Sequence, residues 1–187
     1  MHPEQLIDKR PYPAHVLLSP PPDELADVTV AIEPLNPGER RICAVITIPQ
    51  PVEPIWRVLT DYDKLADFLP SVVLSRRVPH PEGKIRLEQV GAHGFLKFHF
   101  RARMVLDIEE FYPERIAFNG VEGDFVIFRG AWELHPQHQT TQLCYTVHLR
   151  PRVGLPVRLI EGQIRRGVAL NLLAIRQRVA QLATDPP

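Results

Sequence analysis

The stretch that decides the fold is residues 96–108, which read LKFHFRARMVLDI. Every second residue from Leu96 to Ile108 is apolar, and the residues between them are nearly all polar or charged. Side chains of a strand alternate between two faces, so this pattern predicts a long strand with one dry face and one wet face. A sheet built from such strands needs another layer of structure to cover its dry face.

The same period of two continues over residues 72–150, which predicts about six antiparallel strands. The dry rows before and after the long strand are Ile85, Leu87 and Gln89; Ile116 and Phe118; Val126, Phe128, Gly130, Trp132 and Leu134; and Leu143, Tyr145, Val147 and Leu149. Gly123-Asp124 is typical of a two-residue hairpin turn between two of these strands. Residues 40–48, which are β-branched and apolar, predict one further, buried strand.

Helical spacing predicts three helices. Residues 52–61 and 61–69 form a pair of short helices, with Asp61 as the expected N-cap of the second. Residues 155–182 form a long helix with an apolar stripe, and it is the only element long enough to cover the dry face. A single rod cannot fill a wide concave sheet, so we expect a ligand-sized cavity between them.

PIWRVLTDYDKLADFLPSVVLSRR (residues 54–77), together with GDFVIFRGAWEL and the closing NLLAIRQRVAQLA, resembles the START-like, polyketide cyclase/dehydrase and lipid-transport superfamily. The likeness covers roughly residues 39–182 and extends to coenzyme-Q-binding proteins and aromatase/cyclases. It implies an α+β helix-grip fold: a curved antiparallel sheet of about seven strands, two short helices and a long C-terminal helix enclosing a cavity. It also implies a carrier, an enzyme or a partner-binding module as the function.

The expected cavity wall is apolar and aromatic, and the alternative is that the same residues form a solid core. The wall residues are Phe68, Leu69, Leu87, Gln89, Phe98, Phe100, Met104, Phe118, Phe128, Trp132, Tyr145, Ile160, Ile164 and Val168. Gln89, the Tyr145 hydroxyl and the Trp132 indole N–H are the polar groups on this wall. They would either anchor a ligand oxygen or bond to the backbone.

A cyclase or dehydrase would need acids and bases inside the cavity. By alternation the charged strand residues fall on the wet face, so we predict no catalytic residues and no cofactor. Glu161 is the best candidate for an interior charge, and we expect it to form a surface pair with Arg165 four residues on. His135 and His138 lack the convergent partners that a metal needs, so no metal site is predicted.

The distribution of charge limits the kinds of partner that we expect and divides the chain into two parts. The 22 basic and 22 acidic side chains cancel, which argues against bulk binding to nucleic acid. Residues 1–37 hold six acidic and two basic side chains and eight of the 20 prolines. We therefore expect a proline-rich acidic arm over residues 1–38, with one short strand, followed by a mildly basic domain over residues 39–184.

The remaining expectations concern location and surface. Two distant cysteines and the lack of a visible signal peptide or membrane span favour the cytoplasm. The leading function is non-catalytic binding or transport of a lipid, isoprenoid quinone or polyketide-like molecule. A third reading is a membrane- or protein-interaction module that uses the basic faces of residues 97–103 and of the long helix; a solvated surface is the simpler interpretation of those faces.

Overall fold

The computed structural model describes residues 25–95, 98–152 and 157–184, except for the side chains of residues 93–95, 98–100 and 157–160. In this part of the chain the elements run β1 (Thr29–Pro34), β2 (Arg40–Ile48), α2 (Val52–Thr60), η3 (Tyr62–Lys64), α3 (Leu65–Phe68), β3 (Val72–Arg77), β4 (Ile85–Phe95), β5 (Phe98–Phe111), β6 (Arg115–Gly123), β7 (Phe125–Gln137), β8 (Thr140–Pro151) and α4 (Val157–Thr184).

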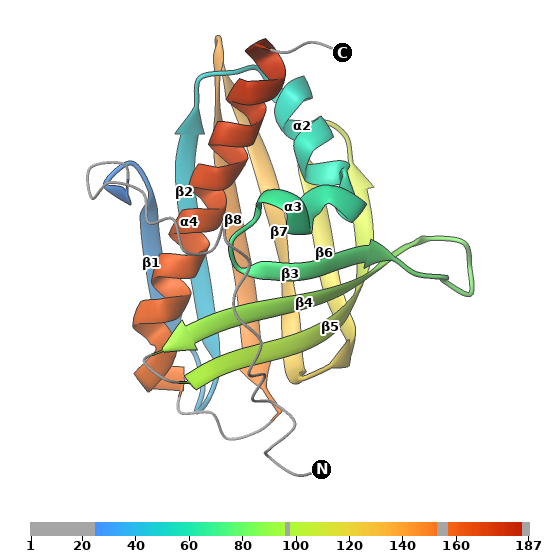
Figure 1. Ribbon diagram of the computed structural model, residues 1–187, viewed down its shortest axis with the longest axis vertical. Helices are drawn as coiled ribbons and strands as arrows, with labels where there is room; N and C mark the ends of the chain where they lie inside the picture. Colours follow the sequence, from blue (N-terminus) through green and yellow to red (C-terminus); the bar gives the residue numbers. More distant parts are fainter. Residues whose placement is uncertain (1–24, 96–97, 153–156, 185–187) are drawn as a thin grey trace.

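The strands form one curved antiparallel sheet in the order β1-β2-β8-β7-β6-β5-β4-β3. All but one of the consecutive strands pair as neighbours; β2 and β3 instead lie far apart, because α2, η3 and α3 separate them in the chain. Figure 1 shows α4 lying along one side of this sheet, with α2 and α3 on the same side. We call that side the inner face and the opposite side the outer face. This arrangement is the START-like helix-grip fold.

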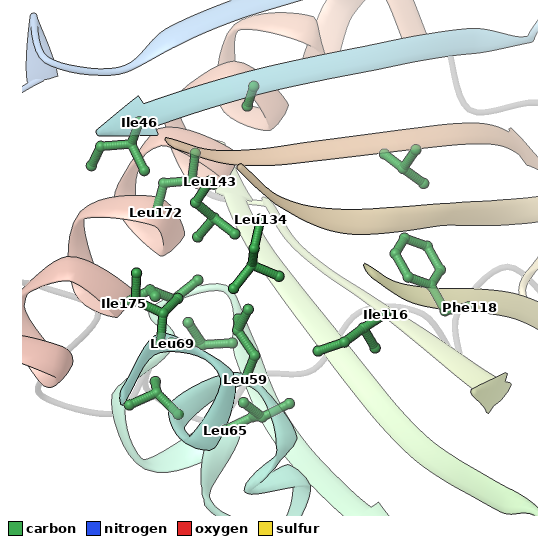
Figure 2. Close-up of a cluster of buried hydrophobic side chains, with 14 of the residues drawn as sticks. Ile46, Leu59, Leu65, Leu69, Ile116, Phe118, Leu134, Leu143, Leu172 and Ile175 are labelled. Carbon is green, nitrogen blue, oxygen red and sulfur yellow. The ribbon is translucent and has the colours of Figure 1, made fainter. Parts of the chain in front are cut away.

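The C-terminal half of α4 is held on the sheet by an apolar core. Leu172, Ile175 and Val179 are completely buried, and they pack with inner-face residues such as Ile46 and Leu143. Figure 2 shows Leu172 beside Ile46 and Leu143, and Ile175 beside Leu69. Burial of large aliphatic side chains is worth about 1.5–3 kcal/mol each, so this half fixes the helix to the sheet.

The sequence predictions for the elements are largely confirmed. The short helix expected at residues 52–61 is α2, and the long one is α4. The second short helix divides into η3 and α3, and Asp61 makes no side-chain capping bond. Instead the neighbouring Asp63 carboxylate accepts a hydrogen bond from the Arg77 backbone N–H, 2.8 Å away.

The sheet has one strand more than expected because β1 pairs with β2 at the edge. This strand falls on the N-terminal side of the division placed at residue 38. The rest of the expected arm lies mostly outside the described residues, so the arm and the domain limits stay predictions.

A side chain would not fit at Gly130 on the inner face of β7. A Cβ there would lie 1.9 Å from the Thr146 carbonyl oxygen and 2.8 Å from the Phe118 ring. Glycine therefore allows β7 to approach β8 closely, and it leaves room for the Phe118 ring to pack over the backbone.

We expect Gly130→Ala to destabilise the fold by about 1–3 kcal/mol or more, because both contacts involve atoms that must move. Gly162→Ala in α4 is the matched control, since nothing lies within 4 Å of its Cβ position. That change should stabilise the protein by about 0.5–1 kcal/mol. Urea unfolding of the three proteins measures both effects, and equal stability of the Gly130 variant and the wild type would contradict the packing argument.

Candidate functional site

Five aromatic side chains gather on the inner face of β6, β7 and β8. We call this set, Phe118, Phe125, Phe128, Trp132 and Tyr145, the aromatic wall. The ring centroids of Trp132 and Tyr145 lie 4.3 Å apart, and those of Phe118 and Tyr145 lie 5.9 Å apart. Phe128 lies 5.7 Å from Phe118 and 5.1 Å from Phe125 by the same measure. The wall is therefore one continuous cluster rather than five separate contacts.

Strand register explains why these rings meet. Trp132 lies directly opposite Tyr145, and Phe118 lies opposite Gly130. Side chains opposite each other on one face of an antiparallel pair have Cβ atoms about 4.5–5.5 Å apart. A bulge in β7 between Phe125 and Ile127 then restores Phe125 to the inner side, where it contacts Phe128.

Tyr145 combines burial with residual exposure. Desolvation raises the pKa of its hydroxyl, so this group stays protonated and neutral at ordinary pH. Part of the side chain nevertheless remains accessible, as it does for Trp132 and Phe128. Within the described residues, neither the Tyr145 hydroxyl nor the Trp132 indole N–H forms a hydrogen bond with the protein. The wall thus offers two donors surrounded by apolar surface.

Gln89 belongs to a different chain of hydrogen bonds. Its side-chain amide donates to the Ser75 hydroxyl at 3.1 Å, and Ser75 donates to the Tyr62 carbonyl at 2.6 Å. The Tyr62 hydroxyl in turn donates to Glu110 at 2.6 Å. Burial, followed by the bond to Glu110, raises the pKa of Tyr62. The amide of Gln89 is therefore held by β3, while the two donors of the aromatic wall are not held.

A partly buried ion pair joins the sheet to the N-terminal half of α4. Arg40 Nε lies 2.6 Å from Glu161 Oε1, and the Arg40 side chain is only 8% exposed while that of Glu161 is 36% exposed. Arg40 lies on the inner face opposite Leu149, which is itself opposite Phe128. The pair therefore lies at the end of a cross-strand row that runs from Phe128 in the aromatic wall through Leu149 to Arg40.

This pairing corrects the expectation that Glu161 would pair with Arg165. Arg165 instead donates to the backbone carbonyl of Val30 in β1. The i,i+4 spacing is equally available to both residues, but α4 lies over β1 and β2, whose groups compete for each side chain. Arg40, a charged residue at the start of a buried strand, is the sequence feature that could have indicated an inner-face partner for Glu161.

The two halves of α4 meet the sheet differently. Ile164 and Val168 in the N-terminal half are only partly buried, in contrast to the fully buried residues of the C-terminal half. At the boundary between the two halves, the Asn171 side chain accepts a hydrogen bond from the Ser71 backbone N–H at 3.2 Å. Glu161 belongs to the less tightly packed half, and its partner Arg40 shares a cross-strand row with Phe128 of the aromatic wall.

The structure places most of the predicted wall residues on the inner face, although some belong to its solid core. Those in the buried core are Leu69, Leu87, Met104 and Phe118, and those partly buried are Phe68, Gln89, Phe128, Trp132, Tyr145, Ile164 and Val168. The side chains of Phe98, Phe100 and Ile160 lie outside the described set. Phe125 joins the wall without having been predicted, because its parity is set by the bulge.

The described part of the chain contains neither a metal-binding cluster nor a membrane-spanning helix. No group of three or more His, Cys, Asp or Glu residues there could hold a metal ion. No helix within the described ranges is long and apolar enough to cross a membrane.

The family of polyketide cyclase / dehydrase and lipid transport proteins matches residues 48–176, more than half of the chain. The chain belongs to this family. Its description covers both activities, so membership supports a hydrophobic ligand or cyclase-type chemistry without choosing between them. No curated protein matches this sequence.

Solved structures with the same fold come from several organisms. TTHA0849 from Thermus thermophilus has a TM-score of 0.66 and 22% identity, with 78% of this chain and 99% of that chain covered. The Zhui aromatase/cyclase from Streptomyces sp. R1128 has a TM-score of 0.63 and 16% identity over 78% and 96%. The STAR-related lipid transfer protein from Xanthomonas axonopodis has a TM-score of 0.59 and 12% identity over 81% and 99%. At these identities the likeness shows the fold alone.

We expect the two halves of the Arg40–Glu161 pair to respond unequally to substitution. Glu161→Gln leaves a nearly buried guanidinium without its carboxylate and should cost about 1–3 kcal/mol of unfolding free energy. Arg40→Met leaves a carboxylate that water can reach, so the cost should be below about 1 kcal/mol. Urea unfolding of both variants checks the order, and a larger cost for Arg40→Met would contradict this account.

Proposed function

We propose that this protein binds a hydrophobic small molecule between the aromatic wall and the N-terminal half of α4, without transforming it chemically. The observation that carries the proposal is that the rings pack side by side and all except Phe118 keep accessible surface, with two donors that no described residue satisfies. Tyr and Trp are the aromatic residues that bring a polar group to an apolar site. A ligand with an apolar body and an oxygen acceptor suits this surface.

The energetic basis is burial of apolar area, worth about 25 cal/mol per Å², with one hydrogen bond adding about 1 kcal/mol. Family membership supports this kind of ligand. A lipid, an isoprenoid quinone and a polyketide-like ring system all satisfy the requirement. Arrival of the ligand requires movement of the 62–70 segment or of α4, and the partly buried half of the helix is the easier part to displace.

Cyclase-type catalysis is the second candidate, and the Arg40–Glu161 pair favours it. An inward-facing charged pair beside an aromatic wall is a feature that an enzyme of this family would need. The two groups neutralise each other, however, and Tyr145 stays protonated, so no described inner-face group on the wall is ready to act as a base. We therefore place binding first.

The direct test is native mass spectrometry and organic extraction of the protein purified from its source. A bound hydrophobic molecule recovered unchanged supports the carrier. A cyclised or dehydrated product recovered in place of an offered linear precursor supports the enzyme instead. Repeated recovery of no ligand, together with no uptake of decyl-ubiquinone or of a fluorescent phospholipid, contradicts both.

We expect Tyr145→Phe to weaken decyl-ubiquinone binding roughly five- to tenfold, because one hydrogen bond to a quinone oxygen is lost while the ring contacts remain. Quenching of Trp132 fluorescence reports the binding, and a Trp56→Phe background removes the other of the two tryptophans.

Tyr112→Phe is the control, since Tyr112 is 64% exposed and contacts Trp56 rather than the wall. The stability of the Tyr145 variant should be unchanged or slightly higher, because its hydroxyl loses no protein partner. Unaltered quinone affinity in Tyr145→Phe would remove this hydroxyl from the site.

A further inference from the structure

The outer face of the sheet divides into two halves that differ in charge compensation. Over β3 to β6 its arginines meet carboxylates: Arg103 Nε lies 2.7 Å from Glu88, and Arg86 Nε lies 2.6 Å from Asp107. Bonds from Arg103 and Arg76 lower the pKa of Glu88, so this carboxylate stays ionised. Arg103, part of the basic strand face predicted from the sequence, is therefore neutralised by its neighbours.

The other half, over β2, β8 and β7, is built differently. Arg41 in β2 and Arg129 in β7 both lie opposite His148 in β8, which puts three basic side chains in one row across three adjacent strands. Arg150 follows at the next alternate position of β8, and Arg152 lies just beyond the end of that strand. Figure 1 shows β2, β8 and β7 side by side, with α4 on their inner side. We call Arg41, Arg129, His148, Arg150 and Arg152 the basic row.

The exposed arginines on β2 and β7 lack acidic partners. Arg41 and Arg129 are exposed, and neither forms an ion pair or side-chain hydrogen bond with another described residue. Glu33 lies opposite Arg41 on β1, and Asn119 lies opposite Arg129 on β6, without such a bond. The exposed arginines therefore concentrate positive charge on this half of the sheet, which a bound anion would offset.

A second observation points in the same direction. The Nε atom of Arg150 is buried and has no hydrogen-bond partner among the described residues. Its Nη1 lies 3.3 Å from Glu39, and Glu39 also lies 3.2 Å from His148 Nε2. A hydrogen bond from Asn36 lowers the pKa of Glu39, so this carboxylate remains ionised and holds both side chains in place. The Arg150 guanidinium is thus held in a fixed position at one end of the row.

We propose that the basic row is a binding site for a phosphate-type anion on the outer face, separate from the aromatic wall. Arginine presents its N–H groups as a planar fork that matches phosphate oxygens, and charge-assisted bonds of this kind are the strong ones. The row supplies two unpaired forks, from Arg41 and Arg129, and the accessible part of Arg150, whose side chain is 42% exposed. The shared chemistry is the phosphate group, which is supplied by free phosphate or by a lipid headgroup.

The first experiment follows the arginine Nε–H signals of the full chain by ¹H–¹⁵N NMR while sodium phosphate replaces sodium chloride at constant ionic strength. Phosphate should shift the signals of Arg41 and Arg129, the two exposed arginines of the row. A parallel arm measures co-sedimentation with vesicles of phosphatidylglycerol and of phosphatidylcholine. Binding of phosphate alone assigns the site to a soluble ligand, and retention on the anionic vesicles alone assigns it to a headgroup.

Two double variants with the same loss of charge separate a site from bulk attraction. Arg41→Gln with Arg129→Gln should weaken the interaction roughly tenfold, the effect of losing charged hydrogen bonds. Arg76→Gln with Arg115→Gln, from the compensated half, should change it less than about twofold. Equal weakening in both variants, or no response to phosphate and to both kinds of vesicle, overturns the proposal. Failure here leaves ligand binding at the aromatic wall untouched, because no residue is shared.

Discussion

The packing of α4 on the inner face is the interaction on which the rest of the structure depends. The sheet is open at β1 and β3, and its inner face is apolar across most of its strands, so it cannot be stable without a cover. The C-terminal half of the helix provides that cover with fully buried residues such as Leu172 and Ile175. The N-terminal half, held largely by polar contacts to β1 and β2, leaves the aromatic wall only partly covered. Under the proposed function, fold stability and ligand access thus depend on different halves of one helix.

Much of the fold follows from local patterns, and the site follows only in part. Alternation places Trp132 and Tyr145 on the inner face, and the 3.6-residue stripe orients α4. Local patterns cannot supply contacts between distant residues, such as Arg40 with Glu161, 121 positions apart. They also fail at the bulge in β7, where one extra residue changes the parity of Phe125. The basic row needed strand register, because Arg41, His148 and Arg129 come from three separate stretches of sequence.

The neutrality of the chain hides this uneven distribution. Equal numbers of acidic and basic side chains exclude a strongly charged protein, but they do not determine where the charges lie. Pairing on β3 to β6 uses carboxylates such as Glu88 for two arginines at once. The β2, β8 and β7 half has one buried carboxylate, Glu39, for its described arginines. A local excess of positive charge therefore coexists with a net charge of zero.

Residues 39–41 connect the two faces physically. The Glu39 carboxylate holds His148 and Arg150 on the outer side, and its backbone carbonyl accepts a hydrogen bond from Arg40 Nη1 at 2.8 Å. Arg40 points inward to Glu161 of α4, while Arg41 points outward to the basic row, since neighbouring residues of a strand face opposite sides. The contact that anchors the less packed half of the helix thus lies one residue from Arg41, which has no acidic partner among the described residues. A change in the position of Glu39 would be felt on both faces, because the same residue binds groups from each.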